Sequence, residues 1–167
     1  MAIKCYAGVG NRDNVPDHIL NLMKDIAAHA AKNGYTLRSG AALGSDSAFE
    51  EGCDRVGGDK KIFLPWKGYN KHTSKNYHIN PEAMLIAQDN HPYWWKSSQG
   101  VKKLLARNVQ ILLDYDLNSP VEFVICYAHD ITMGGTAHTA RVAREYNIPV
   151  FNLADYNAEQ IMQVINR

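Results

Sequence analysis

Short apolar runs alternate with longer segments of helical periodicity along the chain, and this alternation most constrains the fold. The apolar runs have strand length and occupy residues 2–7, 35–38, 61–65, 121–127 and 148–152. The intervening segments repeat apolar residues every three or four positions, which predicts helices at about 16–32, 45–56, 81–88, 97–114, 136–146 and 157–166. Strands joined by helices predict a mainly parallel sheet with helices on both faces. We therefore expect an α/β, three-layer, Rossmann-like fold, in one domain spanning residues 1–167.

The composition is that of an ordinary globular protein and narrows the function only a little. The 167 residues are 46% hydrophobic and 21% charged, with a net charge of +1. This balance does not indicate a nucleic-acid-binding domain with a strongly basic face, although it leaves room for a local basic cluster. The three cysteines form no Cys-x-x-Cys pair, so neither a disulfide framework nor a zinc site is expected. We expect no metal and no cofactor, and buried thiols at Cys5 and Cys126.

The first ten residues contain no apolar run long enough for a signal peptide, and no segment approaches a membrane span of about 20 apolar residues. The expected location is the cytoplasm, without a membrane partner.

Three glycine-rich turns follow predicted strands, and each precedes a predicted helix. The first comprises Gly8, Gly10, Asn11 and Arg12. Glycine lets the backbone approach an anion closely, the N–H groups of a helix start point toward it, and Arg12 could clamp a phosphate. The alternative is a plain strand-to-helix turn, with Asp13 or Asn14 as the helix cap.

The second turn runs from Ser39 to Asp46 and includes Gly40 and Gly44. It is not a Walker A loop, because no lysine follows the glycine. Asp46 could accept a hydrogen bond from a ribose hydroxyl, or Ser45 or Asp46 could cap the following helix.

The third turn, Gly134-Gly135-Thr136, continues through His138 and Thr139 into a predicted helix. Paired glycines followed by hydroxyl side chains suit a phosphate at a helix N-terminus. His138 could act as an acid or base near neutral pH, or be a surface histidine. All three turns lie at the carboxyl ends of strands, where α/β sheets bind their ligands.

Two further features have competing interpretations. Arg107 and Asn108 lie on the long helix, where Arg107 could either reach into a cleft or be solvated. Aromatic side chains crowd the middle of the chain, at Trp66, Tyr69, His72, Tyr77, His78, Tyr93, Trp94 and Trp95. They could stack on a base, form a satellite core or make an oligomer contact, and Tyr93–Trp95 is the candidate contact of an expected homo-oligomer. The polar segment 67–80 is long for a structureless loop, which indicates a functional or partly ordered segment.

The order of these motifs resembles the SLOG superfamily, which joins the Rossmann domain of DNA-processing protein A (DprA/Smf) and the LOG-type nucleotide phosphoribohydrolases. The resemblance covers about residues 5–153 and is carried by GxGxR, SGxAxGxD, RN, GGT and IPVFNL. It implies a Rossmann-like sheet that binds a nucleotide, a nucleotide-derived signal or nucleic-acid phosphate. The residues it implies for the site are Gly10, Arg12, Ser39, Gly40, Gly44, Asp46, Arg107, Gly134, Gly135 and Thr136.

The sequence departs from the hydrolases of this superfamily at one position. LOG enzymes carry a glutamate shortly after their glycine turn, whereas residues 136–140 contain no carboxylate. Glu50, Glu51, Asp46 or Glu122 could replace it. The candidates for an acid, base or stabilising role are therefore Arg107, His138, Glu50 and Glu122, and no catalytic residue is assigned.

Three functions remain open on the sequence. The first is binding of a nucleotide-like small molecule through the glycine-rich turns. The second is N-glycosidic hydrolysis of nucleoside monophosphates, in which a carboxylate would stabilise the oxocarbenium-like transition state. The third is DprA-like binding of single-stranded DNA, for which affinity should fall steeply with salt.

Overall fold

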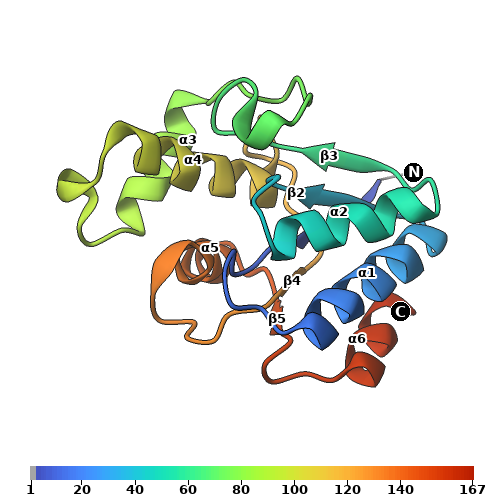
Figure 1. Ribbon diagram of the computed structural model, residues 1–167. Helices are drawn as coiled ribbons and strands as arrows, with labels where there is room; N and C mark the ends of the chain where they lie inside the picture. Colours follow the sequence, from blue (N-terminus) through green and yellow to red (C-terminus); the bar gives the residue numbers. More distant parts are fainter. Residues whose placement is uncertain (1–2) are drawn as a thin grey trace.

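A five-stranded parallel sheet in the order β3-β2-β1-β4-β5 forms the centre of the computed structural model, which describes residues 3–167 (Figure 1). Its strands are β1 (Lys4–Gly8), β2 (Tyr35–Ser39), β3 (Lys60–Ile62), β4 (Val124–Cys126) and β5 (Val150–Asn152). Every neighbouring pair is parallel. The predicted α/β, Rossmann-like class is confirmed. The predicted first strand includes Ala2, which lies outside the described residues.

Helices cover both faces of the sheet and complete the three layers. Three helices, α1 (Asp17–Lys32), α2 (Ser45–Arg55) and α6 (Ala158–Ile165), share one apolar cluster with the sheet. The other cluster contains residues of α3 (Pro81–Asp89), α4 (Gln99–Leu113) and α5 (Gly134–Glu145). Strand β1 supplies both clusters, because successive side chains of a strand point to opposite faces. Tyr6 belongs to the first cluster, and Cys5 and Ala7 belong to the second.

Two predicted helix caps are wrong. Helix α1 has Pro16 as its N-cap and α2 has Gly44, and neither helix start has a side-chain capping bond. The side chains expected to cap α2 bond elsewhere: the Ser45 hydroxyl donates to the Asn11 carbonyl over 2.7 Å, and the Asp46 carboxylate accepts the Gly40 N–H within the same turn. Ser45 therefore bonds the first turn instead of capping α2, and Asp46 bonds the start of its own turn.

Arg38 is a buried cation inside the sheet, only 4% exposed, at a position that the sequence marks simply as strand. Its guanidinium donates to the Ser119 carbonyl over 2.7 Å and lies 3.5 Å from the Asp114 carboxylate. These contacts join β2 to the segment after α4, so the carboxyl end of the long helix is held against the sheet.

The segment between β3 and α4 leaves the sheet and carries two short 3-10 helices, η1 (Tyr69–Lys71) and η2 (Trp94–Lys96), on either side of α3. Its first part folds back onto the second glycine-rich turn, where the Asn70 amide donates to the Ala41 carbonyl over 2.9 Å. Residues 67–80 are thus tied to the body of the protein. No helix within residues 3–167 combines the length and the apolar character that a membrane crossing requires.

Candidate functional site

A cavity of about 500 Å³ opens at the carboxyl ends of β1 and β4. The strand order reverses its direction of growth between these two neighbours, and such a switch point is where open α/β sheets bind ligands. Residues from all three glycine-rich turns line the cavity, together with one face of α4. The sequence prediction that the turns converge is consistent with this arrangement.

The first two turns touch each other directly and form one wall. The N–H of Ser45 donates to the Asn11 carbonyl over 3.3 Å, and the Ser45 hydroxyl donates to the same oxygen. Gly44 makes this approach possible: its φ is +74°, and a Cβ there would lie 2.4 Å from the Arg12 carbonyl oxygen. Only glycine combines that backbone conformation with that spacing.

Asp46 and Arg107 form a buried pair of opposite charge at the base of the cavity. Asp46 is 4% exposed and Arg107 is 5% exposed. The Asp46 carboxylate accepts the N–H of Gly40 over 3.1 Å, while the Arg107 guanidinium donates to the Gly40 carbonyl. Burial raises the pKa of Asp46 to about 6, against the opposing effects of Arg107 and of the N–H groups of Ala42, Gly40 and Gly10. Both side chains thus hold the second turn in shape from inside.

Arg107 also connects the turn to the aromatic wall of the cavity. Its guanidinium carbon lies 5.5 Å from the centre of the Tyr69 ring, and its Nε donates to the Asn108 side chain over 3.0 Å. Burial lowers the pKa of Arg107, and Asp46 and Tyr69 partly offset the effect. Arg107 is therefore a buried residue of the cavity lining and not a solvated helix residue.

The third turn contributes the N-terminus of α5. Gly135, Thr136 and Thr139 line the cavity, and the Thr139 hydroxyl donates back to the Gly135 carbonyl over 3.1 Å. The helix begins at Gly134, two positions before its predicted start, and its N-cap Met133 supplies no side-chain capping bond. The first N–H groups of a helix have no partner within it and carry the positive end of its dipole.

The predicted binding residues fall into two groups. One group lines the cavity: Gly10, Asn11, Arg12, Asp46, Arg107, Asn108, Gly135, Thr136 and Thr139. The other group does not line the cavity: Gly8, Ser39, Gly40, Gly44 and Gly134. In this second group the Ser39 hydroxyl, for example, donates to the Gly8 carbonyl over 2.6 Å.

The structure places His138 away from the cavity lining. The side chain is 1% exposed, and its Nε2 lies 3.0 Å from the Ala87 carbonyl of α3. Burial lowers the pKa of His138 to about 4, so the ring is neutral near pH 7. The histidine belongs to the packing between α3 and α5, which corrects both its surface interpretation and its acid–base interpretation.

Glu50 and Glu122 also lie outside the cavity lining. Glu50 is engaged by Lys60 and His72, whose side chains approach it to 2.7 and 2.8 Å. Burial acts to raise the pKa of Glu50, but these two partners lower it overall. Glu122 immediately precedes Phe123 and β4, so it lies toward the amino end of that strand and the cavity lies beyond its carboxyl end. The carboxylates that do line the cavity are Asp13 and Asp46.

Several lining residues lie outside the three turns and the Arg107-Asn108 pair. Val101, Leu104 and Leu105 precede Arg107 on the same face of α4, and His129 follows β4. The apolar spacing of three and four residues was a usable signal for the α4 face. Among residues 3–167, no group of three or more His, Cys, Asp or Glu side chains is arranged to hold a metal ion.

The fold is shared with two solved DNA processing proteins. DNA processing protein A from Helicobacter pylori, studied for its single-stranded DNA binding mode, superposes with a TM-score of 0.62 and 20% identity, covering 98% of this chain and 79% of that one. DprA from Streptococcus pneumoniae gives a TM-score of 0.57 and 20% identity, over 98% of this chain and 56% of that one. No protein-family model and no curated protein sequence matches the chain.

Proposed function

We propose that the chain binds a nucleotide, with its phosphate held between the first glycine-rich turn and the N-terminus of α5. The observation that carries the proposal is the convergence of all three turns on one cavity at the sheet's switch point. A volume of about 500 Å³ lies within the usual range for small-molecule sites. Backbone N–H groups at Gly135 and Thr136, together with the Arg12 guanidinium, would supply donors for phosphate oxygens.

The opposite wall suits the base and the sugar. Tyr69, Val101 and Leu104 present an aromatic ring and aliphatic side chains to the cavity. A nucleobase stacks on such a surface without needing a particular hydrogen-bond pattern. The nucleotide would then lie with its charged end toward α5 and its base toward η1 and α4.

The carboxylates favour binding over N-glycosidic hydrolysis. Asp46 is buried and already accepts the Gly40 N–H. Asp13 has a side chain that is 76% exposed and lies 3.7 Å from Arg12. Neither is a free carboxylate held at the centre of the cavity, which is the group that an oxocarbenium-like transition state requires.

Calorimetric titration with nucleoside 5′-monophosphates and with the matching nucleosides tests this proposal. We expect the monophosphates to bind more tightly than the nucleosides. Arg12→Ala should weaken monophosphate binding about tenfold, because a hydrogen bond to a charged group is worth about 1.5 kcal/mol or more. Nucleoside binding should be unchanged in that variant. Arg55→Ala, which removes an exposed arginine at the far end of α2, is the matched control.

Two results would contradict the proposal. One is the absence of binding by every monophosphate, and the other is equal binding of nucleosides and monophosphates by the unaltered protein. Chromatography of the same mixtures for free base separates binding from turnover, since steady release of base would replace the binding role with hydrolysis.

Single-stranded DNA binding is the second candidate function, and the distribution of charge favours it. Residues 60–113 contain nine Lys or Arg against two Asp or Glu, although the whole chain carries only +1. The Helicobacter pylori protein that shares the fold was studied for its single-stranded DNA binding mode. Fluorescence anisotropy of a labelled oligothymidylate measures the affinity directly. We expect the affinity to fall as salt rises, and a salt-independent affinity would refute this function.

A further inference from the structure

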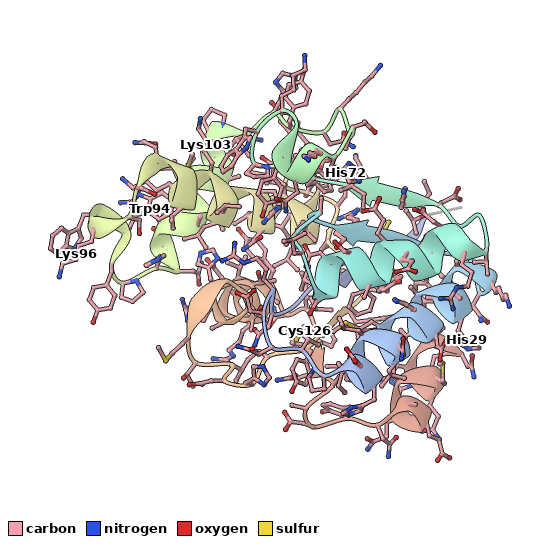
Figure 2. The ribbon with its side chains drawn as sticks, viewed as in Figure 1. His29, His72, Trp94, Lys96, Lys103 and Cys126 are labelled. Carbon is pink, nitrogen blue, oxygen red and sulfur yellow. The ribbon has the colours of Figure 1, made fainter. Side chains whose placement is uncertain are left out.

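Residues 91–103, here called the aromatic arm, comprise the connection from α3 to α4 and the first residues of α4, and they expose two large aromatic side chains. Tyr93 is 61% exposed and Trp95 is 75% exposed. The arm lies at the start of α4, at the end of the molecule away from β3 and β5 (Figure 1). Figure 2 shows Lys96 projecting outward at this end, well away from the labelled His29 and Cys126. The cavity lining uses none of the arm's aromatic rings.

Packing and backbone hydrogen bonds hold the aromatic rings of the arm in place. Trp94 turns inward and packs against the apolar cluster of α3, α4 and α5. The 3-10 turn places its two neighbours outward, and the Lys96 N–H donates to the Tyr93 carbonyl over 3.0 Å. Tyr93 N–H in turn donates to His91 Nδ1 over 3.1 Å. Trp94 is the aromatic residue of this turn that packs against the core. Tyr93 and Trp95 are exposed, so core packing does not explain their aromatic character.

Lysine ammonium groups lie beside the rings of the arm. Lys96 Nζ is 5.6 Å from the ring centre of Tyr93 and 4.9 Å from that of Trp95. Lys102 Nζ is 5.5 Å from the ring centre of Trp94. A cation placed against an exposed aromatic face offers a phosphate contact within reach of a stacking surface.

The arm carries an excess of positive charge. No Asp or Glu occurs from residue 90 to residue 113. Within the described residues 3–167, Lys96, Lys102 and Lys103 take part in no ion pair. Their positive charge is therefore available to an anionic partner.

We propose that the aromatic arm is a contact surface for single-stranded nucleic acid, whose bases stack on Tyr93 and Trp95 while neighbouring phosphates meet Lys96 and Lys102. This inference rests on the second candidate function and assigns it a surface. Helix α4 begins within the arm, at Gln99, and carries Arg107 of the cavity eight residues further on, about 12 Å along its axis. A strand held at the arm can therefore extend toward the cavity along α4.

Titration with oligothymidylates of increasing length, followed by anisotropy and by tryptophan fluorescence, tests the arm. We expect quenching on binding and about a tenfold loss of affinity in Trp95→Ala. Lys96→Ala should lower the slope of log affinity against log salt by about 0.7, the value for one phosphate contact on a single strand. Tyr156→Ala and Lys32→Ala are the matched controls, at an exposed tyrosine and an exposed lysine outside the arm.

The outcomes separate this inference from the function on which it rests. If oligothymidylate binding is unchanged in both Trp95→Ala and Lys96→Ala, the proposed role of the arm is refuted, while single-stranded DNA binding by the protein still holds. No binding by the unaltered protein overturns both. Self-association of the unaltered protein that disappears in Trp95→Ala, with oligothymidylate affinity unchanged, assigns the arm to a second copy of the chain and also overturns the inference.

Discussion

Replacing Gly44 with alanine should destabilise the protein by separating the first two glycine-rich turns. The new Cβ would lie 2.4 Å from the Arg12 carbonyl oxygen, whereas ordinary contacts begin at 3.4 Å. The turns would have to part by about 1 Å, and the hydrogen bond from the Ser45 N–H to Asn11 would lengthen with them. The same substitution at Gly57 provides a control, because φ there is +64° and nothing lies within 4 Å of a new Cβ.

The difference between the two variants reports the close approach together with the backbone conformation of Gly44, whose ψ of −114° lies outside the left-handed helical region. A positive φ costs an L-residue about 1–2 kcal/mol or more, and this cost applies to both variants. Overpacking adds about 1–3 kcal/mol at Gly44 alone. We therefore expect Gly44→Ala to lower the free energy of unfolding by about 2–5 kcal/mol, against about 1–2 kcal/mol for Gly57→Ala.

Equilibrium urea denaturation followed by circular dichroism measures both values, and thermal melting checks them independently. An excess of 1–3 kcal/mol corresponds to a Tm lower by roughly 2–12 °C in a protein of this size. The reasoning is refuted if Gly44→Ala is no less stable than Gly57→Ala, because the contact between the turns would then not depend on the missing Cβ.

Three further predictions concern groups away from the cavity surface. Arg38→Ala should lower the free energy of unfolding by about 3–5 kcal/mol in urea denaturation, since it breaks a buried ion pair and leaves the Ser119 carbonyl without its donor. The pKa of His138 is about 4 in the folded state, below its unfolded value, so its contribution to stability is present above pH 6.5 and is lost as pH falls through 4. The loss should amount to roughly 3 kcal/mol, and His138→Gln should flatten stability measured across this range. Asn157→Ala should cost about 1 kcal/mol in the same denaturation assay, because it removes the reciprocal cap that Asn157 and Gln160 form at the start of α6.

The order of elements could be predicted from the sequence because its signals are local. Apolar runs of strand length, helical periodicity and glycine-rich turns each depend on residues within a few positions. The strand order 3-2-1-4-5 is set instead by which strands pair across the chain. Cap prediction at Ser45 failed for the same reason, since its partner Asn11 belongs to the opposing turn. Asp46 bonds Gly40 at the start of its own turn, so its failure as a cap has a local cause.

The sequence by itself determined the α/β class and the three turns at the carboxyl ends of strands. The tertiary structure alone decided which side chains meet at those turns. Arg107 reaches Gly40 across 67 positions in the chain, and His138, in the same segment as the third turn, faces Ala87 instead of the cavity. The side chains of one helix point in different directions. Packing of the helix against distant elements determines which of them face the cavity. Glycine spacing therefore revealed where a phosphate could approach the backbone, while long-range packing selected the walls of the cavity around it.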